Sequence, residues 1–467
     1  MKKPISLLLC AAMAAANISC SKSYLDTIRE PESLFYRGKF REAAKALRPL
    51  SKKRGRDQLL YMMECGYIHH AAGNYGASNE VLLPASDLAR IVPVSIAKEA
   101  ASLLTSDTVT NYRGEDFEKV LLRMYLGINF LMLGGYDDAR VEFKAVNNEL
   151  ARIKSESGEA RYRQNVMAKY LTALVYEITG DMYGDPEDLE FAYIECRQIL
   201  DLRPDSVLVK RDLARLAAKL DYRDDYEKWV ADFSLAENPS DADRGEAVFL
   251  LQTGRCAVKK SRGKLLDDRT MKGALAVSIA TANPVAGVTV GAVMATLGSA
   301  ENPVPVFERR PGRVDHVVID VSGKKIKAEL LEDISATAIR NMEDRYPLLA
   351  QKVAASVAVK AMMSVAAGIA AKQITEGAGG KSALGAILGA IAGIGTGAAL
   401  FSQMRPDLRC WHTLPDRLHL ARIDLPPGKH QAVLEYMDSS GKCIDKKTLE
   451  LNVEKGKKVF INERCFI

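Results

Sequence analysis

Two pairs of histidines are the candidate metal ligands of this sequence. His412 and His419 lie near Trp411 in strand-like sequence, and His69 and His70 are adjacent in helix-like sequence. A zinc site needs cysteines or carboxylates at matching spacing, and none accompanies either pair. We therefore expect no metal, and we expect His69 and His70 to lie on a surface or in a groove of a helical domain.

The motifs of common enzymes are missing from the sequence. It contains no GxGxxG after a strand, no GxxxxGK[ST], no HExxH and no GxSxG. The glycine cluster at 377–380 follows an apolar helix, which favours a flexible joint over a phosphate cradle. Glu332 and Asp333 suit the positive end of a helix, and no second carboxylate pair can be located. The sequence predicts no catalytic residue and no cofactor.

Cysteine usage bears on the redox compartment. No CxxC motif occurs, and Cys65 and Cys196 fall on apolar helical faces, where buried thiols are expected. The remaining cysteines of the carboxy-terminal half could form a bridge in an oxidising compartment, but their spacing does not identify a pair. These residues are Cys256, Cys410, Cys443 and Cys465.

The first 19 residues have the pattern of a secretory signal peptide. Two lysines are followed by a short apolar core that is too short to span a bilayer. Residues 17–20, Asn-Ile-Ser-Cys, resemble a bacterial lipobox, although Asn17 stands where that pattern has a large apolar residue. We expect lipidation at Cys20, with cleavage near Ala16 and plain secretion as the alternative. Ser21 after the cysteine favours the outer membrane, facing the periplasm.

Charge and length narrow the class of protein. Removing Lys2 and Lys3 with the signal peptide lowers the formal net charge from +6 to +4. The charges are mixed along the chain, without a basic stripe and interleaved aromatics, so nucleic acid is not an expected partner. A chain of 467 residues suits two or three domains.

Residues 112–150 predict two helices folded back on each other. Apolar residues recur at helical spacing on both sides of a break at Gly134 and Gly135. Gly127 on the first helix and Ala139 on the second are small where the helices would touch, which permits close approach. Such a pair needs neighbours to cover its apolar faces.

The turn-and-helix pattern recurs along the amino-terminal half. Residues 38–43 and 73–82 repeat it 35 residues apart, close to the period of a tetratricopeptide repeat. We therefore expect a linker at 20–32 and a helical repeat domain at 33–230, with an ordinary helical bundle as the alternative. In the best unit Arg123 and Asn129 are polar residues between apolar positions. They are candidates for a partner groove, or ordinary solvated residues.

Three stretches carry a resemblance to a known family. They are YRGEDFEKVLLRMYLGINFLMLGGYDDARVEF, EAVFLLQTGRCAVKK and WHTLPDRLHLARIDLPPGKH. Together they resemble tetratricopeptide-containing bacterial lipoproteins of unknown function. The resemblance implies an exported cell-envelope protein with no established catalytic residue. It also implies a link to peptidoglycan assembly, because such proteins look to be encoded near a lipoprotein activator of peptidoglycan synthases.

The carboxy-terminal part, 245–467, predicts a different architecture. Period-2 segments occur at 247–251, 255–259, 304–307, 314–321 and 325–330, and again at 418–423, 430–437, 448–453 and 458–462. The first two read as a hairpin around Gly254, and a helix over 331–346 is expected to end at Pro347. We expect an α+β domain with a small antiparallel sheet or sandwich that is interrupted by a helical insertion.

Two apolar insertions, 273–300 and 348–401, stand out in this part. The second contains Gly385, Gly389, Gly393 and Gly397 at four-residue spacing, which places them near one helix face and permits close packing. Three interpretations remain open: a helix buried in the domain, a self-association or partner helix, and a membrane-inserted segment.

The whole sequence favours a mainly helical protein with a carboxy-terminal α+β part. The function we expect is a non-enzymatic, lipid-anchored scaffold of the cell envelope that holds a protein partner in its repeat groove. One alternative is an enzyme or glycan-processing factor with a site in the carboxy-terminal domain. Another is an oligomeric subunit of an export or assembly machine.

Overall fold

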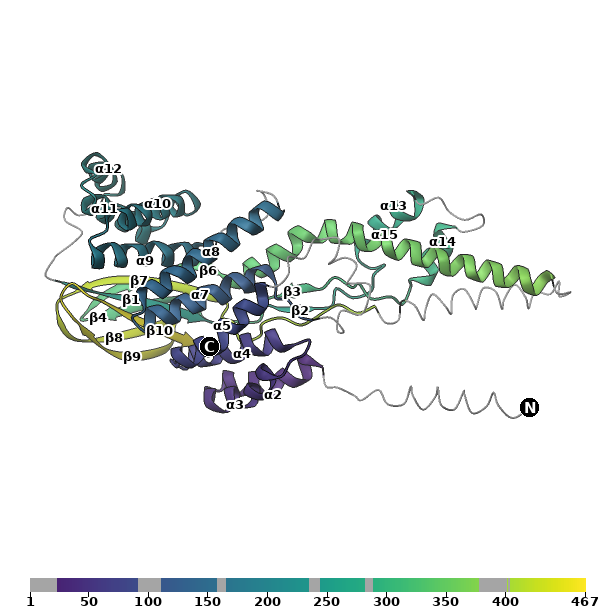
Figure 1. Cartoon of the computed structure of the whole chain (residues 1–467), viewed down its shortest axis with the longest axis horizontal. Helices are drawn as coiled ribbons and strands as arrows, with labels where there is room; N and C mark the ends of the chain where they lie inside the picture. The colour runs from purple at the N-terminus through teal and green to yellow at the C-terminus, as the bar shows by residue number, and fades with distance from the viewer. Residues whose placement is uncertain are drawn as a thin grey trace.

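The computed structural model describes residues 23–90, 111–157, 165–234, 244–281, 289–377, 401 and 404–467. The predicted signal peptide, Cys20 and the four spaced glycines lie outside these residues. Within them the protein has a stack of paired helices, two four-stranded β-sheets, a two-stranded sheet and a long helical arm (Figure 1). A helical repeat region followed by a mostly antiparallel sheet region confirms the predicted fold class.

The helical repeat region consists of antiparallel pairs joined by short turns. Gly38, Gly73 and Gly134 occupy the first three turns, each with a positive φ near 75° that suits glycine. The pairs are α2 (Tyr24–Tyr36) with α3 (Phe40–Lys52), α4 (Gln58–Ala71) with α5 (Tyr75–Arg90), α7 (Asp116–Met132) with α8 (Tyr136–Ser157), α9 (Val166–Tyr183) with α10 (Pro186–Leu202), and α11 (Val207–Lys219) with α12 (Arg223–Phe233).

The predicted linker at 20–32 is wrong over most of its length. Ser23 caps α2 by accepting the backbone N–H of Asp26 at 3.1 Å, and the helix begins at Tyr24. Tyr24 and Ile28 are buried, because they pack their apolar surface against the following helices. The first repeat therefore starts about ten residues earlier than its sequence suggests.

A glycine lets the two helices of a pair approach closely in successive units. A Cβ atom at Gly127 would lie 2.7 Å from the ring of Phe143, and one at Gly66 would lie 2.3 Å from Leu82. The glycine precedes its contact by the same number of residues in both pairs, as expected for a structural repeat. Ala139 is fully buried in the same α7–α8 unit.

Two four-stranded sheets form the second part. The strand orders are β10-β1-β7-β6 and β5-β4-β8-β9, and every pair within them is antiparallel except β1 with β10. The strands are β1 (Gly245–Thr253), β4 (His316–Val321), β5 (Lys324–Lys327), β6 (Glu329–Asp333), β7 (Arg417–Leu425), β8 (Gly428–Met437), β9 (Cys443–Val453) and β10 (Lys458–Cys465).

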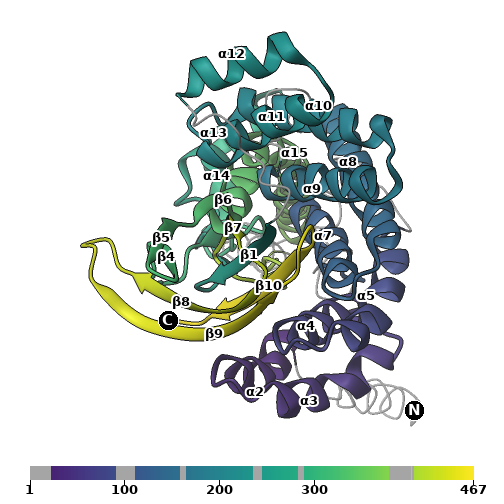
Figure 2. The same cartoon turned by 90° about the vertical axis from the view of Figure 1, so that its left-hand side faces the viewer.

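Strand β1 is buried along its whole length because both of its faces are covered. Phe249 and Leu251 point into the core between the two sheets. Val248 and Leu250 alternate with them and join the core of the helical repeats. The order of layers is therefore helices, first sheet, second sheet, and the helices curve around one face of the first sheet (Figure 2).

The predicted hairpin around Gly254 is wrong. Gly254 has φ +69° and ends β1, but the next strand, β2 (Val258–Lys260), pairs with β3 (Val306–Glu308) instead. Strand β1 takes β7 and β10 as its neighbours. These partners lie about 165 to 210 residues further along the chain, so a local turn signal could not identify them.

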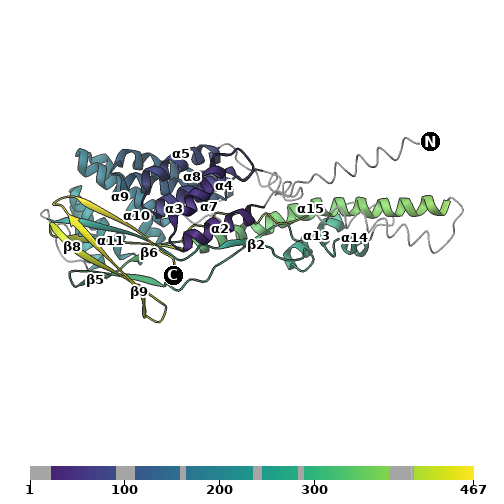
Figure 3. The same cartoon turned by 90° about the horizontal axis from the view of Figure 1, so that it is seen from below.

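The arm consists of α13 (Arg269–Thr281), α14 (Val290–Thr296) and α15 (Ile334–Gly377). It extends away from the body of the molecule in two perpendicular views (Figures 1 and 3). Asp333 caps α15 by accepting the backbone N–H of Ala336 at 2.7 Å. The predicted end at Pro347 is wrong: the helix continues through this proline, because buried Tyr346 and Leu349 anchor it on both sides.

Candidate functional site at the inner face of the helical repeats

The inner face of the repeats is formed by the first helices of four pairs, α4, α7, α9 and α11. It is the surface on which a helical stack usually binds a partner. Here it packs against β1, β7 and β10, and against an extended segment at 409–413 that precedes β7 (Figure 2). Most of the polar contacts between the two parts of the molecule are made on this face.

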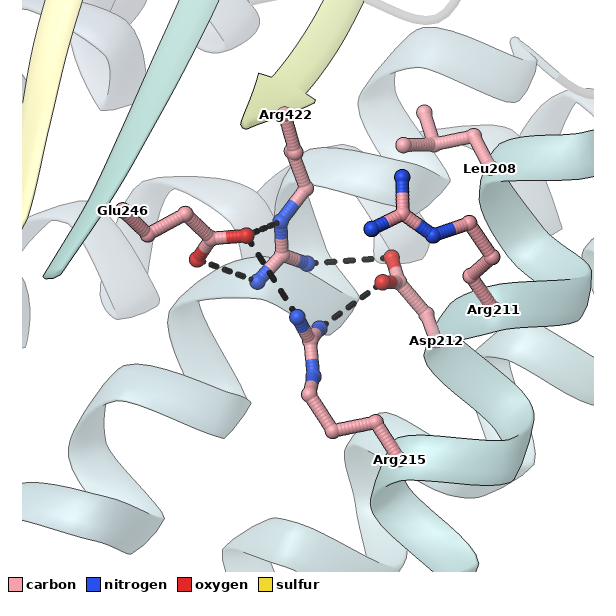
Figure 4. Close-up of a pocket in the computed structure, with 6 residues that line it drawn as sticks. All are labelled: Leu208, Arg211, Asp212, Arg215, Glu246 and Arg422. Carbon is pink, nitrogen blue, oxygen red and sulfur yellow. Dashed lines mark hydrogen bonds and ion pairs between the residues drawn. The ribbon is translucent and has the colours of Figure 1, made fainter. Parts of the chain in front are cut away.

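Arg422 on β7 lies at the centre of a buried ion cluster. Its guanidinium donates to Glu246 at 2.5 and 2.7 Å, to Asp212 at 3.0 Å and to Glu177 at 3.0 Å. Arg215 of α11 donates to the same three carboxylates at 2.8 to 3.4 Å. Figure 4 shows the guanidinium groups of Arg422 and Arg215 between Asp212 and Glu246, while Arg211 lies beside Asp212 with no dashed line to the other residues drawn.

The charges in this Arg422 cluster compensate one another. Burial alone would raise the pKa of Glu246, but Arg422, Lys458 and Arg215 outweigh it and hold that pKa below its ordinary value. Burial likewise opposes ionisation of Glu177, and Arg215, Lys458 and Arg422 lower its pKa. Glu246 and Glu177 therefore stay ionised and paired, which suits a structural joint between helices and sheet rather than acid–base catalysis.

A second polar network joins α4 and α7 to β1. Gln252 accepts the hydroxyls of Tyr67 at 2.8 Å and Tyr125 at 3.2 Å. Its amide nitrogen lies 2.8 Å from Nε2 of His70, whose Nδ1 lies 2.6 Å from Asn129. Burial lowers the pKa of His70 to about 4, so the ring is neutral here. The expected surface or groove position of His70 is wrong.

Asn129 and Arg123, the two predicted groove residues, lie in different surroundings. Asn129 is fully buried and donates to Ser78 and Asn79 at 2.9 and 2.8 Å, so its prediction as a partner contact is wrong. It satisfies buried polar groups where two repeat units meet. Arg123 is 18% exposed and pairs with Glu142 at 2.8 Å, beside a cleft between α5, α7 and α8.

The segment at 409–413 crosses the inner face as a bound peptide would. Both carboxylate oxygens of Glu64 bind it: Oε1 accepts the backbone N–H of His412 at 2.6 Å, and Oε2 accepts the N–H and hydroxyl of Thr413 at 3.1 and 2.6 Å. Glu118 of the next inner helix accepts the N–H of Trp411 at 2.7 Å. The repeat groove is thus filled by the chain's own segment.

Trp411 is the main apolar anchor of this segment. It is 1% exposed, and its ring centroid lies 6.1 Å from those of both Tyr67 and Tyr125 in edge-on geometry. Burial and then the nearby Glu115 raise the pKa of Glu118 to about 7. Glu118 accepts hydrogen bonds from the hydroxyl of Tyr112 and from the backbone N–H groups of Glu115 and Trp411. Its carboxyl oxygens are therefore engaged within the protein, which favours a structural role.

The remaining candidate metal and redox residues do not converge. His412 lies 3.2 Å from Glu32 of α2, whereas His419 lies 3.3 Å from Thr253 inside the first sheet. No group of three or more histidines, cysteines or acidic residues in the described part of the chain could hold a metal ion. The four carboxy-terminal cysteines, for which no pair could be predicted, are free thiols: Cys256, Cys410, Cys443 and Cys465.

Comparison with known proteins gives a distant likeness only. Two solved structures of a Podosopora anserina putative kinesin light chain with nearly identical TPR-like repeats, one of them a point variant of the other, are similar to this chain at 13% identity. They cover 44% of it and 92% and 91% of their own chains, at a TM-score of 0.30. At that score the likeness supports no inference about activity. No family model and no curated protein matches.

The residues that build the inner face were missed at the sequence level, although a signal was present. Glu64 lies within a largely apolar helical run, and Arg422 lies between the apolar residues Ala421 and Ile423 of a strand-like segment. A charge in such a run must be paired when it is buried. That argument identifies both residues as members of polar contacts, but it does not identify their partners.

Proposed function

We propose that this protein is a non-enzymatic interaction scaffold of the bacterial cell envelope whose outer helices, rather than its repeat groove, bind a protein partner. One observation carries this proposal. The inner face is covered by the chain's own sheet and segment 409–413, whereas the outer helices keep large apolar side chains in solvent. The partner surface is therefore expected on the convex side of the stack.

Most exposed apolar side chains of the repeats lie on the second, outer helices of the pairs, α5, α8 and α10, and the others lie at helix ends and turns. Phe191 and Ile194 are 43% and 42% exposed and lie three residues apart on α10, so they share one helix face. None of the large exposed apolar residues in the described chain belongs to a β-strand. Others on the repeats are Leu83, Leu88, Leu133, Val141, Met182, Tyr183, Leu202, Val207 and Tyr222.

The direct test is affinity capture from envelope extracts. The double variant Phe191→Ser, Ile194→Ser should reduce capture of partner proteins by about tenfold, because apolar anchors dominate protein interfaces. The matched control is Arg197→Ser with Asp201→Ser, two exposed polar positions on the same helix. Equal capture by the apolar variant and the control, at unchanged melting temperature, would rule out this surface.

Location in the envelope is the second part of the proposal. It is supported by the signal-like residues 1–19, by the lipobox-like residues before Cys20 and by the family resemblance, which adds the link to peptidoglycan assembly. Metabolic labelling with a fatty acid should mark the wild type and not Cys20→Ala. Equal labelling of both would remove the lipid anchor from the proposal.

The two alternative functions make different demands. An enzyme in the carboxy-terminal part would need an open pocket with converging acid–base groups. Glu332, whose pKa burial raises to about 7, is instead bonded to Thr337 at 2.5 Å within the protein. An assembly subunit would require self-association, which sedimentation of the purified chain measures directly.

A further inference from the structure

Part of the arm, from Gly273 to Ala300, presents an exposed surface without charge. Every exposed residue described between 273 and 300 is uncharged, and Val277 and Val290 on this surface are 64% and 45% exposed. These exposed positions are Gly273, Val277, Ala280, Thr281, Thr289, Val290, Gly291, Ala295, Gly298 and Ser299. Helices of soluble proteins normally expose charged side chains to water, so an uncharged exposed surface of this extent indicates an interaction site.

The exposed residues of helix α15 change from polar to mostly apolar along the arm. Its exposed positions are polar near the body, at Glu343 and Gln351, and apolar further out, at Ala355 and Val359, with Lys352 and Lys360 partly buried between and beside them. Val359 is 49% exposed. Among the described residues, one helix, Ile334–Ala366 of α15, is long and apolar enough to cross a membrane by length and composition, and 53% of its most apolar window is buried.

We infer that the arm places its uncharged surface in a lipid bilayer, as a membrane contact separate from the lipid anchor. The bilayer core needs about 20 apolar residues along a helix, and α15 meets that requirement by length and composition. The uncharged run 273–300 adds the exposed residues of α13 and α14 beside it. Buried Val353, Val357 and Ala361 hold α15 in the core cluster that also contains Leu275 and Ile279 of α13, so the arm enters lipid as a packed unit.

The position at which α2 begins agrees with a bilayer on this side. Helix α2 begins on the side of the body toward which the arm extends (Figure 1), and Cys20 precedes it by only four residues. In this one respect the inference rests on the proposed lipidation. A chain anchored at Cys20 would have its arm pointing at the membrane that holds the anchor.

The test separates the arm from the anchor. The full chain carrying Cys20→Ser, which cannot be acylated, is floated with vesicles of phosphatidylethanolamine and phosphatidylglycerol. We expect it to float, and we expect Val277→Asp, Val290→Asp and Val359→Asp together to lower the bound fraction by about tenfold, because charged groups are costly in lipid. The matched control is Val141→Asp, since Val141 on α8 is also 64% exposed.

A second measurement keeps the result independent of folding. Val359→Cys carrying an environment-sensitive dye should shift its emission to the blue when vesicles are added, while a dye at Val141→Cys should not. The inference is overturned if the unacylated chain stays in the aqueous fraction, or if the triple variant floats like its parent. It is also overturned if the arm forms dimers in lipid-free buffer that Val359→Asp dissociates, because a second copy would then cover the surface. If the unacylated chain floats but the wild type is not labelled at Cys20, the membrane contact of the arm is supported and only the proposed lipid anchor is ruled out.

Discussion

The inner face of the repeats and the arm are both rich in apolar residues, but they meet their surroundings in different ways. At the inner face, charged side chains lie among the apolar ones: Arg422 of β7 bonds to Glu177 and Asp212 of the helices, and Glu64 of α4 binds segment 409–413. On the arm, the exposed positions of α13 and α14 from Gly273 onward carry no charge. Hydrogen bonds and ion pairs fix the position of one protein segment, whereas an uncharged surface suits the proposed contact with a lipid bilayer.

This difference has consequences for stability as well as for binding. Removing a buried charge from the inner face leaves its partners unpaired, and that cost is large. Changing an exposed side chain on the arm removes little that the folded protein uses. Substitutions should therefore have effects on unfolding that decrease from the ion cluster to the arm.

The largest effect is expected at the ion cluster. Arg422→Met should lower the free energy of unfolding by about 4 kcal/mol, because Glu246, Asp212 and Glu177 all lose a buried donor. Arg211→Met is the control: its side chain is 43% exposed and it pairs with Asp424 at 3.5 Å, so it should cost below about 1 kcal/mol. Urea denaturation measures both, and similar costs would mean that the cluster is not a structural joint.

The next effect concerns the segment held on the inner face. Glu64→Gln replaces one acceptor oxygen by a donor facing groups that already donate, and should cost about 3 kcal/mol. Glu80→Gln on the exposed side of α5 should leave the urea midpoint unchanged. A small effect of Glu64→Gln would show that segment 409–413 is loosely bound, which would reopen the groove to an external peptide.

The inner face should also respond to pH through His70. Its folded pKa of about 4 lies below the ordinary value of 6.5, because burial disfavours the charged ring. Its contribution is therefore fully present above about pH 6.5 and is lost as the pH falls toward about 4, since the unfolded chain then binds a proton that the folded chain does not. Between pH 7 and pH 5 the wild type should lose about 2 kcal/mol more than His70→Gln. Equal losses in urea melts would contradict a neutral, buried His70.

An effect of similar size is expected at the close helix contact of the best repeat. Gly127→Ala places a methyl group 2.7 Å from the ring of Phe143 and should cost about 2 kcal/mol. Gly76→Ala, at a helical glycine with open space around it, should instead stabilise by up to about 1 kcal/mol. Thermal melting compares them, and a shift of the same sign in both would contradict the packing argument.

The smallest effect is expected on the arm. Val359→Ser and Val277→Ser remove exposed methyl groups, so each should change the free energy of unfolding by less than about 0.5 kcal/mol. A loss well above that value in the absence of lipid would show that another part of the protein covers these side chains. It would also remove the distinction between the arm and the inner face.

The local elements of this protein follow from short-range patterns in its sequence. Helical periodicity and turn glycines predicted the paired helices, and period-2 segments predicted strands near β4, β7, β8 and β10, because these signals depend on neighbouring residues. The packing glycine at 127 was also readable, since a helix pair needs small residues where it touches. Errors at the linker 20–32 and at Pro347 arose because distant packing overrode local preference.

Only the tertiary structure decided what occupies the inner face. Segment 409–413 lies 293 to 349 residues from the carboxylates that bind it, and β1 pairs with strands near the end of the chain. No local pattern encodes such partners, because the free energy of these contacts depends on burial that exists only after the sheet and helices have packed. For the same reason, sequence placed Asn129 in a groove while the fold buried it, and only the fold could separate the covered face from the exposed arm.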